Sequence, residues 1–422
     1  MAMTLNTLRK MYAVILSLSL LIAWVIGSYF QLDVSALLVF FGDDSHCDRI
    51  TEAIGAHCFG DFASIRTEKL NSLPNGAEGV YPVSSRIFRY PFTMIERIFS
   101  YRVSVFVFLI VLAFAVLFPL LHQFQRKRMS ISDVAILGIC TLPFLATLDR
   151  GNLVGFTSAF LYLYIRALQR SRYRSAVVCL VLMVAIKPQL AVFLILMFLI
   201  RAYKVAIIGV VAVVSTVVLP YTIFGMDMLV QLKNWITAAQ GWSKSQLPTA
   251  RYPSNLSSTT IGDVFGVSKL LPIVVLCVTA LYVGLTFLRS GKDTQSASNT
   301  VEDTSFVISV GMILASPITY PYYLVIMLPF LAFAIERYEK SAQSEIVRDG
   351  VEYVRAVALL VVMSPLVLPN SLAVSVSPPS QSLYNIFPLI QSGVLLVALL
   401  AFISLKQFRT TDQPGKGLRK GY

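Results

Sequence analysis

Long apolar runs, joined by short connectors rich in lysine and arginine, make up most of this chain. Most runs hold about 20 residues, the length that an α-helix needs to cross the hydrocarbon core of a bilayer. Their apolar residues are continuous rather than alternating, which favours helices over the strands of a barrel. The pattern predicts an all-α integral membrane protein with spans at residues 11–30, 103–121, 131–147, 153–168, 204–224, 270–288, 356–373 and 386–405.

Two further runs, residues 175–200 and 306–335, are interrupted near the middle. Lys187-Pro188 interrupts the first, which also has basic residues at both ends, and residues 316–323 interrupt the second. Proline removes a helix hydrogen bond, and a lysine deep in hydrocarbon is costly. We therefore expect each run to fold as two half-length helices, which enter the membrane and return to the same side. One kinked span is the alternative for residues 175–200. Counting each half as a helix gives about twelve helices in a single polytopic domain over residues 1–422.

The placement of charge sets the expected orientation. The chain carries 35 Lys and Arg against 22 Asp and Glu, and 56% of its residues are hydrophobic. The basic residues gather at the ends of the apolar runs, as the positive-inside rule describes, so we exclude a nucleic-acid partner. This predicts a multi-pass protein of the cell inner (plasma) membrane with both termini cytoplasmic, including the tail at residues 406–422. External loops are expected at about residues 32–102 and 225–266.

The first of these loops holds many of the chain's carboxylates. A membrane chain that keeps its acidic side chains in one external loop is expected to use that loop for chemistry. The acidic residues of the loop are Asp43, Asp44, Asp48, Glu52, Asp61, Glu68, Glu78 and Glu96.

Two cysteines and two histidines share this loop. Cys47 and Cys58 are expected to form a disulfide if the loop faces an oxidising compartment. His46 and His57 are interpreted as ordinary loop histidines, which are far commoner than metal ligands, and no C-x-x-C spacing suggests zinc.

Short strings in a fixed order connect residues 60–325 to a known family, and their order is more specific than any one of them. The strings are Gly60-Asp61-Phe62, Val80-Tyr81, Tyr90-Pro91-Phe92, Arg150-Gly151-Asn152, Ile186-Lys187-Pro188-Gln189, Asn255-Leu256-Ser257 and Ser316-Pro317 through Tyr323. In this order they resemble the polyprenyl-phosphate-sugar enzymes of glycosyltransferase family 87. The chain departs from the family pattern at Phe92, where a second proline is usual, and at Leu256, where glutamine is usual.

The resemblance implies a GT-C fold and transfer of a hexose, mannose by family analogy. The donor would be a polyprenyl phosphate, and the acceptor a glycan or glycolipid on the non-cytoplasmic face of the bilayer. The implied reaction is inverting and independent of metal, with no cofactor. A transporter or flippase of lipid-linked or small solutes, and an oligosaccharide polymerase or ligase, are the alternatives. A transporter would be expected to show repeat symmetry, and a polymerase to place its large loop late in the chain.

Such a reaction needs a base for the acceptor hydroxyl and donors for the departing phosphate. Asp61 matches the acidic-aromatic position of the family pattern and is the first choice for the base; Asp43 and Asp44 are its alternatives. Lys187 is the sharpest candidate for the phosphate. Arg150 is another, unless it pairs with Asp149 and only stabilises its turn. The remaining substrate-binding candidates are Asn152, Arg251, Asn255 and Tyr320.

Overall fold

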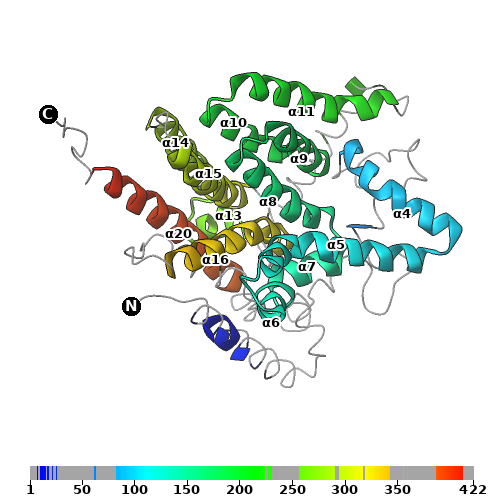
Figure 1. Ribbon diagram of the computed structural model, residues 1–422, viewed down its shortest axis with the longest axis horizontal. Helices are drawn as coiled ribbons and strands as arrows, with labels where there is room; N and C mark the ends of the chain where they lie inside the picture. The colour runs from blue at the N-terminus through cyan, green and yellow to red at the C-terminus, as the bar shows by residue number, and fades with distance from the viewer. Residues whose placement is uncertain are drawn as a thin grey trace.

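The computed structural model describes residues 82–223, 256–289, 294–316, 319–342 and 386–411. It also describes single positions elsewhere, among them residues 10–15, 61, 62, 355 and 359. Every regular element in the described part is a helix, so the all-α class is confirmed there. Figure 1 shows these helices packed against one another, with α4 (Arg86–Ile98) set apart beside the start of α5 (Tyr101–Gln125).

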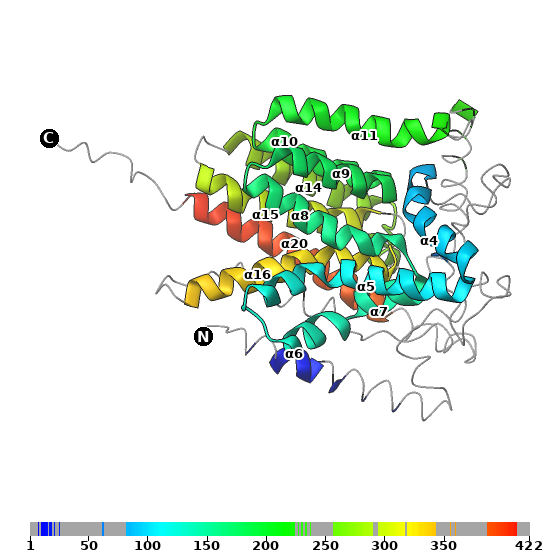
Figure 2. The ribbon, with the colours of Figure 1, turned by 45° about the vertical axis from the view of Figure 1, so that its right-hand side comes forward.

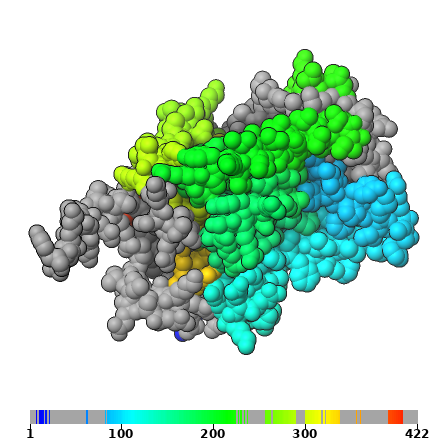
Figure 3. All heavy atoms as spheres, turned by 45° about the horizontal axis from the view of Figure 1, so that its top comes forward, coloured from blue at the N-terminus to red at the C-terminus, as the bar shows by residue number. Residues whose placement is uncertain are grey.

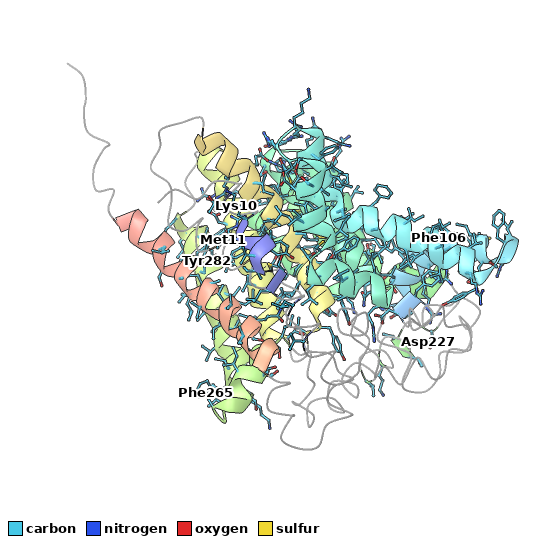
Figure 4. All side chains as sticks on the ribbon, turned by 90° about the horizontal axis from the view of Figure 1, so that it is seen from below. Lys10, Met11, Phe106, Asp227, Phe265 and Tyr282 are labelled. Carbon is cyan, nitrogen blue, oxygen red and sulfur yellow. The ribbon has the colours of Figure 1, made fainter. Side chains whose placement is uncertain are left out.

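Three described helices are long and apolar enough to cross a membrane: α5, α11 (Tyr203–Ile223) and α14 (Leu270–Arg289). They coincide closely with the expected spans at 103–121, 204–224 and 270–288. The Ser100 side chain caps α5 by accepting a hydrogen bond from the Val103 amide. Along α5, Phe108 is buried, whereas Phe106, labelled in Figure 4, is exposed. An apolar helix with an exposed apolar side is what a lipid-facing span requires. The total of about twelve helices stays a prediction.

The run at residues 175–200 folds as a hairpin. Helix α9 (Tyr173–Ile186) ends at Lys187, after which η6 (Pro188–Leu194) and α10 (Ile195–Leu199) return. The Tyr164 hydroxyl, in the middle of α8 (Phe156–Gln169), donates to the Phe193 carbonyl over 2.7 Å. A span that continued straight past Pro188 would carry Phe193 away from α8, so the expected pair of half-length helices is confirmed.

The run at residues 306–335 also returns on itself. Helix α15 (Thr294–Ala315) is followed by η8 (Pro321–Met327) and α16 (Leu328–Ala342). Arg337 on α16 lies 3.0 Å from Glu302 and 3.2 Å from Asp303 on α15, so the open ends of the two arms meet. Helix α15 begins twelve residues before the expected run. In these polar turns, Glu302 and Asp303 are paired with Arg337, which offsets the cost of burying their carboxylates.

The expected span at residues 131–147 is not one straight helix. Helix α6 (Ile131–Val134) runs into the π-helical η4 (Ala135–Ile139), and the chain bends by 70° before α7 (Leu142–Arg150). Pro143 is the second residue of α7, in the first turn, where a backbone N–H would have no partner within the helix. The Tyr12 hydroxyl donates to the Cys140 carbonyl at the break, over 3.1 Å. Proline and a side-chain partner for the freed carbonyl together account for the bend.

Most of the described helices run side by side, as Figure 2 shows for α5, α8, α9 and α16. The space-filling view shows α11 along the outside of one face (Figure 3), and α11 packs on α9 and η6. Helices α13 (Ser258–Val264) and α20 (Ile386–Thr411) pack against each other and against α15. The 14-residue helices α8 and α9 are each about 21 Å long, whereas the 25 residues of α5 extend about 38 Å. The start of α8 is level with the middle of α5, since Gly155 lies against Leu112 and Val116, while Tyr162 further along α8 bonds with Gln123 near the end of α5.

Candidate functional site

The turn between α7 and α8 presents two of the predicted site residues. Gly151 ends α7 in the left-handed conformation, at φ 60°, which favours glycine because it lacks a Cβ atom. Asn152 follows and caps η5 (Leu153–Gly155): its Oδ1 accepts from the Val154 amide over 2.8 Å. Because this bond uses the side-chain oxygen, the Asn152 Nδ2 group points away from η5 and can donate elsewhere.

A close approach to α5 holds this turn in place. A Cβ atom on Gly155 would lie 2.6 Å from Leu112 and 2.9 Å from Val116 of α5, and 2.7 Å from Thr147 of α7. Only glycine allows three segments to meet so closely here. The turn is therefore fixed against the middle of the longest span, inside the helix assembly rather than at the end of α5.

Asp61 lies on this turn. Its Oδ2 atom accepts from Asn152 Nδ2 over 2.8 Å and from Arg150 Nε over 3.2 Å. The Asp61 and Arg150 side chains are 14% and 19% exposed, and Asn152 is fully buried. The structure thus joins three of the residues singled out from the sequence, although about ninety positions separate Asp61 from the other two. Arg150 pairs with Asp61, so its role is not confined to an ion pair with its neighbour Asp149.

Lys187 lies at the tip of the α9 hairpin. Its backbone is extended (φ −142°, ψ 107°), its side chain is only 6% exposed, and Nζ lies 5.5 Å from the centre of the Tyr323 ring. The neighbouring Ala185 carbonyl accepts from the Ser84 hydroxyl over 2.9 Å, which ties the start of α4 to this tip. An amino group over an aromatic face can be attracted by the ring's electrons, most strongly where water is excluded.

The tyrosines beside Lys187 form a stack in η8 and the residue before it. Tyr320 and Tyr322 lie 5.4 Å apart between ring centres, and Tyr322 and Tyr323 lie 5.0 Å apart. The element η8 packs against both α7 and η5, so it connects the Lys187 tip to the Asp61 turn. The predicted binding residue Tyr320 is thus part of a larger aromatic surface.

Two of the sequence strings are neighbours in space. The Leu256 amide donates to the Thr319 carbonyl over 2.8 Å, and the Ser258 hydroxyl donates to the Leu314 carbonyl over 2.7 Å. The loop that follows Asn255 therefore lies on the break between α15 and η8. Leu256 and Ser258 therefore lie beside the string that contains Tyr320.

A family model for glycosyltransferase family 87 matches residues 80–317, more than half of the chain. The chain belongs to glycosyltransferase family 87. No curated protein and no solved structure matches it. The match includes Arg150, Asn152 and Lys187, whereas Asp61 precedes it and Tyr320 follows it. The protein is therefore a glycosyltransferase with helices suited to a membrane, and the role of Asp61 depends on its geometry.

Several predicted residues of this family 87 chain lie outside the described residues: Asp43, Asp44, Arg251 and Asn255. The same is true of Cys47, Cys58, His46 and His57. Within the part that is described, no group of three His, Cys, Asp or Glu side chains could hold a metal ion.

Sequence reasoning did not single out three residues that the structure places beside the candidate site residues: Tyr322, Tyr323 and Arg89. It named Tyr320 without Tyr322 and Tyr323, although these continue the same string and their aromatic repetition was a usable signal. It also did not single out Arg89, which stacks on Phe62, the residue after Asp61. No local pattern marks Arg89, because it is one of several arginines between residues 86 and 102.

Proposed function

We propose that this family 87 enzyme transfers a hexose, mannose by family analogy, from a polyprenyl phosphate to an acceptor hydroxyl. The acceptor would be a glycan or glycolipid on the non-cytoplasmic face of the inner membrane. The main support for the proposal is the Asp61 carboxylate, which accepts hydrogen bonds from Arg150 and Asn152 at the turn between α7 and α8. A carboxylate fixed by two donors is suited to act in one orientation on a bound substrate.

Asp61 would act as the general base. As the acceptor oxygen attacks the anomeric carbon, its proton passes to the Asp61 carboxylate. The bond between that carbon and the phosphate oxygen breaks, and its electron pair leaves with the lipid phosphate. One such displacement inverts the configuration at the sugar, and neither metal nor cofactor takes part in it. The acceptor hydroxyl and the donor must therefore lie on opposite sides of the anomeric carbon.

Lys187 would balance the charge of the departing phosphate. It is a buried cation on a hairpin tip, and its neighbours are aromatic rings that offer a face to a sugar or to a prenyl chain. Interactions with a developing anion are strongest where water is excluded. Arg150 would hold Asp61 in place, and its positive charge would lie beside the base rather than beside Lys187.

The basic residues of the chain support a non-cytoplasmic site. Helix α5 leads from the Asp61 region to Arg128, and α8 leads from Asn152 to Arg166, so both arginines lie at the opposite ends of their helices from the site. There, both pair with Glu336 of α16, over 3.2 Å in the case of Arg128. The positive-inside rule would put this basic end in the cytoplasm, and hence the Asp61 end outside. The inner membrane and cytoplasmic termini belong to the same proposal.

A transfer assay tests the function directly. Purified protein is incubated with radiolabelled polyprenyl-phosphate mannose and a glycolipid fraction, and the expected result is label moving from the prenyl lipid to the acceptor. Parallel donors carrying glucose or galactose determine the sugar. If the protein instead moves intact labelled lipid across a vesicle membrane without breaking the sugar–phosphate bond, the proposal is wrong and a flippase is indicated.

Replacing Lys187 with methionine is expected to weaken donor binding. The change keeps the apolar stem and removes the charge. Since a hydrogen bond to a charged group contributes about 1.5–3 kcal/mol, the KM for the donor should rise roughly 10–100-fold. Lys204→Met is the matched control, because Lys204 is exposed at the start of α11, at the other end of the hairpin. Equal donor KM values for the two variants would leave Lys187 with a structural role only.

A further inference from the structure

Phe62, the residue after Asp61, is more deeply buried than Asp61 itself. Phe62 is fully buried and lies among aromatic rings from α4 and α5. Its ring centre is 4.4 Å from that of Phe108, 6.1 Å from Tyr101 and 6.4 Å from Phe92. Aromatic contacts of this kind add about 0.5–1.5 kcal/mol per pair to the burial of the ring. Asp61 is therefore covalently attached to a buried aromatic anchor.

A buried arginine covers the Phe62 ring. The Arg89 guanidinium carbon lies 3.4 Å from the ring centre, and the side chain is fully buried. Arg89 donates to Glu96 over 2.7 Å and to the Ser104 hydroxyl over 3.2 Å; Ser104 in turn donates to the Phe92 carbonyl over 2.7 Å. These bonds fix the plane of the guanidinium, so the ring beneath it has one well-defined position.

The aromatic rings around Phe62 are connected to the turn that carries the partners of Asp61. Phe108 contacts Phe62 on one side and lies 6.1 Å from the ring of Phe156 on the other. Phe156 begins α8, directly after the η5 turn that Asn152 caps. A displacement of Phe62 would thus move Asp61 relative to the turn that carries Arg150 and Asn152.

Helix α4 has an unusual distribution of side chains that fits this role. It buries Arg89, Phe92 and Thr93 while Ile87 and Ile98 are exposed. Burying an arginine is costly unless it is paired and hydrogen-bonded, and Arg89 meets this condition through Glu96 and Ser104. The guanidinium contacts Phe62, Glu96 and Ser104, and none of these three is itself a candidate base or phosphate ligand.

We propose that Phe62 and Arg89 are positioning residues, which hold the Asp61 carboxylate at the distance and angle that proton transfer requires. The inference rests on the proposed role of Asp61 as the base. Neither residue touches substrate. The ring locks the backbone at residue 62, and the two hydrogen bonds from Arg150 and Asn152 then determine the direction of the carboxylate.

Phe62→Ala tests the proposal through separated kinetic constants. Since a displacement of about 1 Å can cost 10²-fold in rate, kcat per folded enzyme is expected to fall roughly 10–100-fold. The KM for the donor should not change, because the Lys187 tip is untouched. Phe62→Leu, which retains an apolar filling, should recover part of kcat. The matched control is Phe402→Ala: Phe402 is equally buried, on α20 against Phe306. A similar loss of kcat in the control would show that Phe62 contributes only to general packing.

A double-mutant cycle with Asp61→Asn separates this inference from the proposed function. If Phe62 acts through Asp61, adding Phe62→Ala to Asp61→Asn should cause no further loss of residual rate. Additive losses would show that Phe62 acts elsewhere and would overturn the positioning role. Full activity of Asp61→Asn alone would instead overturn the base, whatever Phe62 does. If Phe62→Ala does not fold, the same cycle is measured with Phe62→Leu.

Discussion

Asp61→Asn is expected to lower turnover by about 10²–10⁴-fold, the usual contribution of a positioned general base. An asparagine side-chain oxygen can accept the same two hydrogen bonds from Arg150 and Asn152, so the turn should keep its geometry. What is lost is the ability to take the acceptor's proton. The KM for the donor and the expression level should stay close to those of the parent enzyme, and the measurement is kcat under saturating donor.

Asp133→Asn is the control for this loss. Asp133 closes the capping box at the start of α6, beside the basic end of the bundle and away from the site, and accepts from the Ser130 amide over 2.9 Å. This variant should retain its kcat. The variants Asp43→Asn and Asp44→Asn are measured alongside. Loss of transfer in either of these, with Asp61→Asn active, would move the base to the exit of the first span.

Arg355→Met is expected to destabilise the fold by about 3–5 kcal/mol, the usual cost of removing one partner from a buried ion pair. Arg355 is fully buried and lies 2.6 Å from Glu302 and 3.6 Å from Asp303, with the Phe306 and Phe330 rings nearby. Without it, the two buried carboxylates on α15 would lose a cationic partner, although Arg337 would still pair with both. Thermal unfolding in detergent measures the effect as a lower midpoint.

Two further variants test whether the loss of stability comes from the missing ion pairs or from any change of arginine to methionine. Arg172→Met removes an exposed arginine and should change the free energy of unfolding by no more than about 0.5 kcal/mol. Adding Glu302→Gln to Arg355→Met should recover part of the lost stability, because one unpaired charge disappears with it. If Arg355→Met unfolds at the parent temperature, the ion pairs of Arg355 with Glu302 and Asp303 do not stabilise the fold.

The sequence strings named residues that the structure brings together, but they did not predict the contacts between them. The order of the strings indicated the family, and the match over residues 80–317 shows it. Arg150, Asn152 and Asp61 were each chosen separately, and their meeting at one carboxylate oxygen was not foreseen. Hydrogen-bond partners far apart in the chain depend on how helices pack, which no local pattern contains.

Hydropathy and charge by themselves determined the helical class, the positions of α5, α11 and α14, and the two hairpin breaks at Lys187-Pro188 and residues 316–323. These features are local, because the cost of burying polar groups in lipid acts on each segment separately. Only the tertiary structure decided the 70° bend before α7, the early start of α15 and the burial of Arg89. Each of these depends on a distant partner: Tyr12 for the Cys140 carbonyl, Arg337 for Glu302, and Phe62 for the Arg89 guanidinium. A polar or charged group inside a membrane protein is stable only where such a partner lies, and its location is a property of the packed helices.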